Sequence, residues 1–111
     1  MRLWKQPASI RINADAFAVE GLDPPREPVA LDDIQEVTFF KRDELTTDLI
    51  CCDIVVCTAQ GVETWFLHEE LPGWDDLTRL LERLPGFDSQ WFRKVAWPAF
   101  ASNPTSVFKR V

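Results

Sequence analysis

IQEVTFFKRD (34–43), LICCDIVVCT (49–58), VETWFLHE (62–69) and GWDDLTRLLERL (73–84) are the four segments that decide the fold. The first three are rich in β-branched and aromatic residues and are separated by turn-forming residues, which is typical of consecutive β-strands. The fourth has the apolar periodicity of a helix. Three adjacent strands followed by a helix predict a curved sheet that is capped at one end.

The strand expected over residues 34–41 alternates between two faces, because successive side chains of a strand point in opposite directions. Each face carries one phenylalanine, so we expect both faces to be partly covered. One face holds Val37, Phe39 and Lys41, and the other holds Glu36, Thr38 and Phe40.

The strand expected from Leu49 onward is the most apolar segment of the chain. Its even positions are wholly apolar, and its odd positions are apolar apart from Asp53. A strand that is apolar on both sides is typical of the covered centre of a sheet. We therefore predict the central strand here, with Ile50, Cys52, Ile54 and Val56 on one face and Leu49, Cys51, Val55 and Cys57 on the other.

A helix is predicted over residues 74–84. Its apolar positions recur as one stripe, with acids in the first turn and arginines near the end, both of which suit the helix dipole. Pro85 and Gly86 end it. The stripe consists of Trp74, Leu77, Leu80, Leu81 and Leu84. A second short helix is expected over 89–96, with Asp88 as its N-cap.

The remaining segments complete a single domain over residues 1–111. Residues 10–12 and 17–19 predict a hairpin, and 29–31 a short edge strand. Residues 1–9 are expected to be a lead-in, and 99–111 to be irregular or extended. The fold class that follows is α+β, with a bent, mainly antiparallel sheet of about six or seven strands.

Acidic residues are concentrated in the middle of the chain. The 111-residue sequence has a formal net charge of −6, but residues 31–90 carry fourteen acidic against four basic side chains, a net −10. Residues 91–111 carry four basic side chains and no acid. An acidic body repels phosphate backbones and anionic lipid. We therefore expect no nucleic acid and no membrane as partner, and attraction to a basic protein.

Three cysteines lie in the central strand, where they cannot readily pair with one another. Cys51 and Cys52 point to opposite faces, and Cys57 lies about 16 Å along the strand from Cys52. Unpaired thiols are typical of a reducing compartment, so we expect a cytoplasmic location. Residues 1–10 lack the apolar core of a signal peptide, and no apolar run approaches the ~20 residues that span a bilayer.

Several segments together resemble a family of small bacterial proteins of uncharacterised function that have a pleckstrin-homology-like fold. They are DDIQEV (32–37), FKRDELTTDLIC (40–51), LHEELPGWDDL (67–77), LPGFD (84–88) and PAF (98–100). The resemblance covers about residues 10–104. It implies a strongly bent antiparallel sheet whose open end is closed by a C-terminal helix. In lipid-binding members of that superfold, lysines and arginines line the first hairpin, whereas here Arg11 stands alone among Asp15 and Glu20.

Few residues in the sequence are suited to catalysis. His68 is the single histidine, beside Glu69 and Glu70 on a predicted strand, whereas a zinc protease needs two histidines spaced i, i+4 on a helix. The cysteines lack the paired C-x₂-C spacing of a zinc site and an evident activating base, so we interpret all three as small core residues. We predict no catalytic residue, no metal site and no cofactor.

Asp53 interrupts the most apolar strand, where a charged carboxylate needs either water or a partner. Two structural interpretations stay open: its face is partly solvated, or it pairs with a base such as Lys41 or Arg42 on the preceding strand. Either is favoured over catalysis, because no second titratable group is evidently recruited to it.

Charged residues at the ends of elements form two candidate interaction sites. The first is the tip 41–48, which starts with Lys41 and Arg42 and is either a solvated turn or a recognition loop. The second is a group of acids that serve either solubility and helix capping or a docking face for a basic partner: Asp32, Asp33, Glu69, Glu70, Asp75 and Asp76.

Large aromatic residues offer a third route to an interface. We expect most of four tryptophans to pack helix against sheet, while one or two left exposed would mark a protein interface, because tryptophan is enriched at binding hot spots. The four are Trp65, Trp74, Trp91 and Trp97.

These features favour a non-catalytic protein-interaction or scaffold module that binds through an acidic and aromatic surface. Self-association through an apolar edge is one form of it. The alternative is an inhibitor or immunity protein that neutralises a toxic enzyme by covering its basic cleft. A toxin-like partner encoded beside this protein would favour the alternative.

Overall fold

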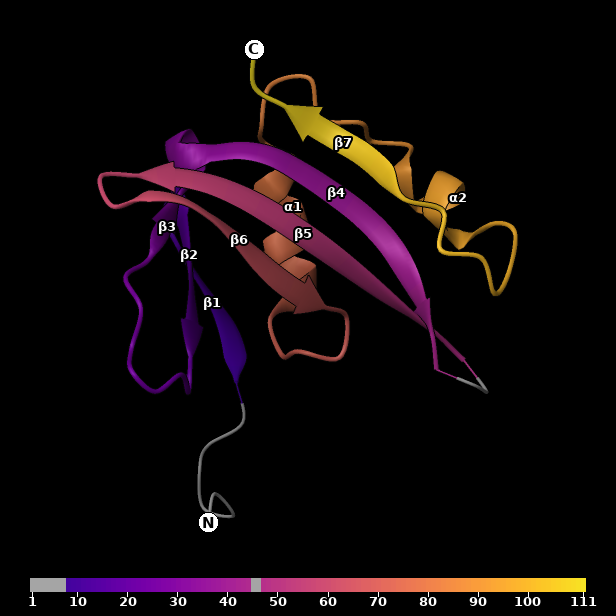
Figure 1. Ribbon diagram of the computed structural model, residues 1–111, viewed down its shortest axis with the longest axis horizontal. Coiled ribbons are helices and arrows are strands. Elements are labelled where there is room, and N and C mark those ends of the chain that lie inside the picture. The colour runs from indigo at the N-terminus through magenta and orange to yellow at the C-terminus, as the bar shows by residue number, and fades with distance from the viewer. Residues whose placement is uncertain (1–7, 45–46) are drawn as a thin grey trace.

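The computed structural model describes residues 8–44 and 47–111. Within these ranges the chain is an α+β protein with seven strands in two antiparallel sheets, two α-helices and one short 3-10 helix. The predicted class and the mainly antiparallel pairing are confirmed. The strands form two sheets instead of one continuous sheet, and the four-stranded sheet arches over the rest of the molecule (Figure 1). The expected lead-in falls largely outside the described residues.

The first sheet has the order β1-β2-β3, with bounds β1 Ser9–Asn13, β2 Ala16–Glu20 and β3 Val29–Ala30. The hairpin predicted at residues 10–19 is confirmed, with Ile10 opposite Val19. Its turn includes Ala14 in the left-handed region at φ 56°. A 3-10 helix over Leu31–Asp33 leads from β3 into the second sheet.

The second sheet has the order β6-β5-β4-β7, with bounds β4 Ile34–Asp43, β5 Asp48–Thr58, β6 Gly61–His68 and β7 Thr105–Lys109. The three strands predicted from the pattern are confirmed, and β5 is central as expected. β7 comes from the segment expected to be irregular or extended, and it pairs with β4 in the register Glu36–Lys109. Its partner is about seventy residues away in the chain, which local sequence cannot reveal.

The four-stranded sheet has an inner face, which bears Phe39 and Ile54, and an outer face, which bears Phe40 and Asp53. The inner face holds the core. Phe39 is fully buried, and its ring lies 5.9 Å from that of Trp74 and 4.0 Å from that of Trp91, measured between centroids. Figure 1 shows helix α1 behind this sheet, on its inner side.

Helix α1 spans Trp74–Leu81, three residues less than the predicted 74–84. The next residues continue in tighter turns, with the Leu84 N–H donating to the Leu81 carbonyl at 3.0 Å. Leu84 therefore stays buried even though it lies outside the helix. The predicted apolar stripe is confirmed as core: Trp74, Leu77, Leu80, Leu81 and Leu84 are all buried.

Helix α2 spans Trp91–Ala96 and starts two residues later than predicted. Asp88 does not cap it directly. Its side chain accepts the Gln90 N–H at 2.9 Å, and its carbonyl accepts the Trp91 N–H at 3.2 Å, so that Asp88 forms the turn before the helix. β7 follows α2, and the chain therefore returns to the sheet after its helices. In the described part of the chain, neither helix has the length and apolarity to cross a bilayer.

Candidate protein-binding surface

The connection from β6 to α1 is a tight turn fixed by Gly73. Gly73 has φ +93°, and a Cβ added there would lie 2.1 Å from the Ile10 carbonyl oxygen, so that only glycine fits. The preceding Pro72 carbonyl accepts the Ile10 N–H at 2.7 Å, which ties the turn to β1. The acids on either side of this turn are thus held on a well-anchored backbone.

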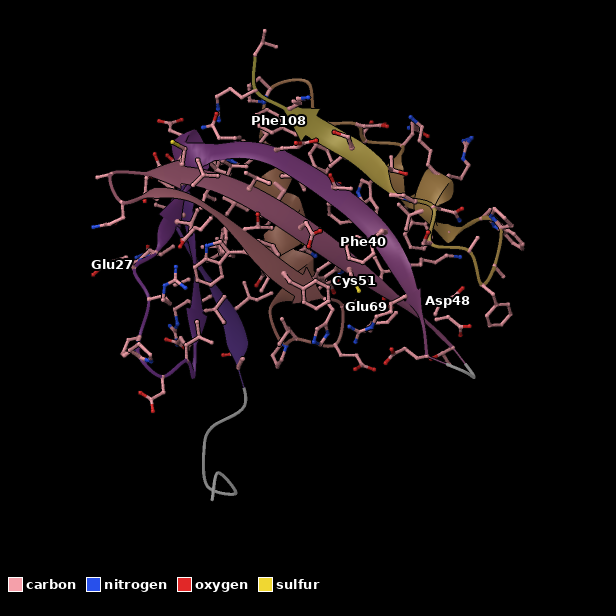
Figure 2. The ribbon with its side chains drawn as sticks, in the orientation of Figure 1. Glu27, Phe40, Asp48, Cys51, Glu69 and Phe108 are labelled. Atoms are coloured by element: carbon pink, nitrogen blue, oxygen red, sulfur yellow. The ribbon has the colours of Figure 1, made fainter. Side chains whose placement is uncertain are left out.

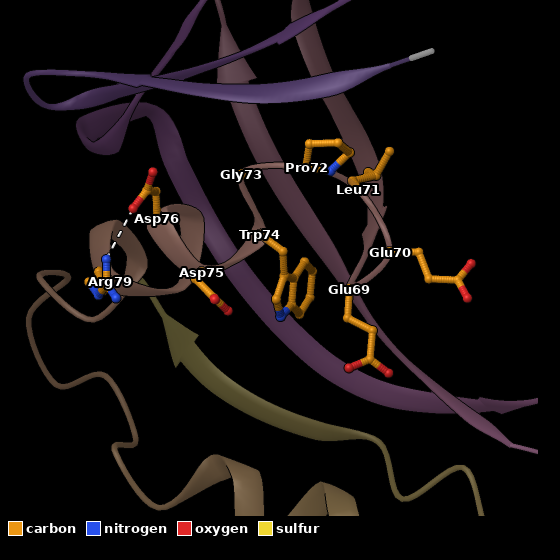
Figure 3. Close-up of a pocket in the computed structure, with 9 residues that line it drawn as sticks. All are labelled: Glu69, Glu70, Leu71, Pro72, Gly73, Trp74, Asp75, Asp76 and Arg79. Atoms are coloured by element: carbon orange, nitrogen blue, oxygen red, sulfur yellow. Dashed lines mark hydrogen bonds and ion pairs between the residues drawn. The ribbon is translucent and has the colours of Figure 1, made fainter.

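A surface hollow of about 520 Å³ opens at this turn, and we call it the acidic hollow. Figure 3 shows the Trp74 indole in its centre, with the Glu69 and Asp75 carboxylates nearby and the side chain of Glu70 extending outward. Leu71 and Pro72 supply further apolar lining. The full lining is Glu69, Glu70, Leu71, Pro72, Gly73, Trp74, Asp75, Asp76 and Arg79.

Four carboxylates and one guanidinium give the acidic hollow a net charge of −3. Asp76 pairs with Arg79 at 3.1 Å, and Glu69 Oε1 accepts the Ile50 N–H at 2.9 Å, so these two acids have structural partners. In the described ranges, Glu70 and Asp75 are exposed and their carboxylates form no ion pair. These two are the acids most available to a cation from outside.

The structure therefore brings together four of the six acids that were predicted as an interaction site. Asp32 and Asp33 lie elsewhere, in the 3-10 helix after β3. Asp32 lines a separate, smaller hollow beside Asp15 and Arg83. The sequence placed all six at element ends, but only the fold decides which ends are neighbours.

Lys41 is not part of a surface recognition tip, and this expectation is corrected. Its side chain is only 4% exposed, and its ammonium lies 3.0 Å from the Asp48 carboxylate. It also donates to the carbonyls of Ala96 at 2.7 Å and Pro98 at 2.8 Å. Because it alternates with Val37 and Phe39 along β4, its stem points inward. Lys41 fastens the segment after α2 to the sheet.

Asp48 completes this buried junction. Its carboxylate also accepts the Phe100 N–H at 2.9 Å. That hydrogen bond and the Lys41 ammonium hold the pKa of Asp48 below its ordinary value. Arg42, by contrast, is exposed and pairs with Glu44 at 3.0 Å, and its guanidinium lies 5.6 Å from the centre of the Phe66 ring. Residues 45–46 of the predicted tip lie outside the described residues.

Trp97 is the exposed one of the four tryptophans considered as interface markers. It is 72% exposed, while Trp65, Trp74 and Trp91 are buried. Phe100, 62% exposed, follows in the segment that the Lys41 and Asp48 side chains hold, and Phe92 on α2 is 56% exposed. No local pattern predicts the exposure of these phenylalanines, because it depends on how α2 and the segment after it dock.

The histidine and cysteines that were considered for catalysis or metal binding differ in their burial and contacts. His68 is half-buried, and its Nδ1 accepts the Glu70 N–H at 3.3 Å. Burial raises the pKa of Cys51 to about 11 and raises the pKa of Cys52 still further, so both thiols stay protonated. Cys57 is exposed, and its interpretation as a core residue is wrong. It lies on the outer face of β5 opposite Val62, which is itself 71% exposed.

Of the two structural interpretations of Asp53, the first applies: its face is partly solvated. It is half-buried on the outer face, opposite Thr38 and Phe66, while Lys41 points to the inner face and Arg42 pairs with Glu44. Burial raises the pKa of the Asp53 carboxyl. Among residues 8–44 and 47–111, no three histidine, cysteine or acidic side chains converge as a metal site.

Comparison with known proteins identifies no relative of this chain. The chain matches no protein-family model, no curated protein and no solved structure. The geometry of the acidic hollow and the exposed aromatic residues is therefore the basis for a functional proposal.

Proposed function

We propose that this protein is a non-catalytic interaction module whose acidic hollow binds a basic segment of a partner protein. The observation that carries the proposal is the convergence of Glu69, Glu70, Asp75 and Asp76 around the Trp74 indole at one anchored turn. A lysine or arginine that enters the hollow meets carboxylates at the rim and an aromatic ring at the floor. Both contacts favour a cation, the first by charge and the second by cation–π attraction.

The charge distribution of the whole chain supports the same partner chemistry. Residues 31–90, which include the hollow, carry a net charge of −10. Such a surface steers a basic partner during diffusional encounter and raises the association rate more than it slows dissociation. Trp97, exposed on a segment that is held in place by Lys41, supplies a rigid aromatic contact of the kind that is enriched at interfaces.

The test compares three forms of the protein as bait in affinity capture followed by binding kinetics. Glu70→Lys with Asp75→Lys reverses the two available acids of the hollow, and Asp32→Lys with Asp33→Lys makes the same charge change elsewhere. We expect a basic partner to be captured by the wild type and the control and lost with the hollow variant. Its association rate should fall as salt rises.

Two results would overturn this proposal. One is a partner that binds both variants equally with unchanged association rates. The other is loss of binding with the control alone. Far-ultraviolet circular dichroism of both variants verifies that folding is retained. We expect this because three of the four acids are exposed and Asp33 is half-buried, and such acids contribute little to stability.

In the inhibitor alternative, the same surface binds a more specific target. A basic enzyme cleft, such as one that binds a phosphate backbone, has the charge that the acidic body attracts. Inhibition of a toxin-like enzyme encoded beside this protein, abolished by the hollow variant and kept by the control, would establish it. A captured partner without enzymatic activity would favour the scaffold form.

The resemblance to the pleckstrin-homology-like superfold remains a proposal about ancestry. Two antiparallel sheets with α1 against the inner face support it. The position of α1 before α2 and β7, instead of at the end of the chain, departs from the capping helix that the resemblance implies. A cytoplasmic location is proposed on the same level, and the three free thiols support it.

A further inference from the structure

The central strand β5 carries an apolar pattern on two faces, and the single chain covers the outer one only in part. Its sequence is apolar on both faces, which is typical of a strand covered from both sides. The inner face is covered by the core, to which Cys52, Ile54 and Val56 belong.

Figure 1 shows no helix or strand in front of the outer face, among the residues that the structure describes. Leu49 and Cys51 on this face are buried beneath neighbouring side chains, whereas Val55 is half-buried and Cys57 is exposed. The outer face therefore lacks a second layer of backbone over it.

Aromatic and aliphatic side chains are gathered on that outer face. Phe40 and Phe66, on strands either side of β5, have ring centroids 6.1 Å apart, and the His68 ring lies 6.1 Å beyond Phe66. Phe66 is 43% exposed and Val62 is 71% exposed. Figure 2 shows Phe40 and Cys51 near the middle of the arched sheet. Cys51 lies beneath this layer and outside the core cluster.

The charges on the outer face nearly balance, in contrast to those of the rest of the chain. Strand register places Glu36 opposite Lys109, and alternation along β4 and β5 adds Arg42 and Asp53 to the same face. With Glu44, which pairs with Arg42 at 3.0 Å, three acids and two bases give this face a net charge of −1, in a chain whose net charge is −6. A second copy meets less repulsion at this face than at the acidic hollow, and an isologous contact requires such a self-compatible patch.

The size of the face also fits a dimer. β5 has 11 residues, so at about 3.3 Å per residue it is ~36 Å long, and four strands spaced ~4.8 Å apart are ~19 Å wide. That rectangle of about 700 Å² is an upper bound, because β4, β6 and β7 are shorter, at 10, 8 and 5 residues. Summed strand by strand the footprint is about 540 Å², which fits a weak dimer below the ~800 Å² that each partner buries in a standard interface.

We propose that the outer face of the four-stranded sheet is a homodimer interface, in which two copies pack face to face and each supplies the layer that the other lacks. The ring cluster of Phe40, Phe66 and His68 lies at its centre, and Cys57 and Val62 lie near one end. Packed sheets lie about 10 Å apart, a spacing that side chains of this size fill. This interface adjoins the acidic hollow where the His68 ring accepts the Glu70 N–H, but it shares no residue with the lining of the hollow. The proposal therefore does not depend on the proposed function.

Sedimentation equilibrium or light scattering after gel filtration measures the oligomeric state. From micromolar to near-millimolar concentration, the mass of the wild type should rise from 12.8 kDa to twice that value. Phe66→Glu should stay monomeric throughout. Phe92→Glu is the matched control, because Phe92 is a similarly exposed phenylalanine on α2, and this variant should dimerise like the wild type.

Cys57 provides a second measurement on the unmodified protein. It is exposed while Cys51 and Cys52 are buried, so alkylation under native conditions reports on Cys57. The reaction should slow as the concentration of wild-type protein rises. This measurement decides the matter even where Phe66→Glu fails to fold, which circular dichroism at low concentration would reveal.

The proposal fails if the wild type is monomeric at every concentration, if Phe66→Glu dimerises as well as the wild type, or if Cys57 reacts at the same rate throughout. Loss of the dimer in Phe92→Glu but not in Phe66→Glu would place the interface on α2 instead. The variant with Glu70→Lys and Asp75→Lys should remain dimeric, so that this proposal and the proposed function fail separately.

Discussion

The inner and outer faces of the four-stranded sheet bear similar residues but differ in how far the chain buries them. Phe39 on the inner face is fully buried among aromatic rings, whereas Phe66 on the outer face is 43% exposed. Each face also has an acid from β5: Asp48 is held by a lysine, while Asp53 forms no ion pair within residues 8–44 and 47–111. The inner face is thus covered within one chain, whereas the outer face is available to pack against another protein surface.

The largest test of this contrast removes a side chain from the core behind the inner face. Leu81 is fully buried, so Leu81→Ala should lower the free energy of unfolding by about 2–5 kcal/mol. Val62→Ala on the outer face, measured at a concentration that keeps the protein monomeric, should change it by less than about 0.5 kcal/mol. Urea unfolding followed by tryptophan fluorescence measures both. Similar values for the two variants would remove the distinction between the faces.

A smaller effect is expected at the buried junction. Lys41→Met keeps the apolar stem but leaves the Ala96 carbonyl without its donor and the Asp48 carboxylate without its cation, while the Pro98 carbonyl still accepts from Asn103. The change should cost about 1–3 kcal/mol. The exposed neighbour provides the control, since Arg42→Met should stay within about 0.5 kcal/mol of the wild type. An unaffected Lys41→Met would mean that Lys41 does not fasten the segment that carries Trp97.

The smallest expected effects are pH-dependent changes in stability, and they have opposite signs for Asp48 and Asp53. The pKa of Asp48 is lowered from 3.8, so its contribution to stability is present above that value and is lost as pH falls through the folded-state pKa. Asp48→Asn should therefore be less stable than the wild type near neutral pH, and the difference should shrink in acid. The lowered pKa of Asp88 adds to the acid sensitivity of both forms equally.

Asp53 should behave in the opposite way. Its pKa is raised from 3.8 by burial, so the folded state loses stability as pH rises through the unfolded and then the folded pKa. Asp53→Asn should be more stable than the wild type near neutral pH, and this gain should vanish in acid. Urea unfolding of dilute protein between about pH 3 and pH 7 tests both variants. Shifts of the same sign would contradict the assigned surroundings of one of the two acids.

Local sequence was sufficient for the elements whose pattern is set by neighbours in the chain. The stripe from Trp74 to Leu84 identified the helix and its buried side, because side chains three and four apart share one face of a helix. Alternation likewise identified the inner rows of β4 and β5. The same alternation placed Lys41 with Val37 and Phe39, and its charge obscured a burial that the pattern already indicated.

The sequence by itself determined the class of fold, the central strand, the acidic body and the two apolar faces of β5, the outer one interrupted by Asp53. The tertiary structure alone decided that β7 pairs with β4, that Trp97 is exposed, and that Glu70 and Asp75 border one hollow while Asp32 borders another. The physical reason is the separation along the chain of the residues that each signal involves. Hydrophobic periodicity records which side of an element avoids water, whereas pairing and clustering depend on residues far apart in the chain, whose proximity is created only when the core closes.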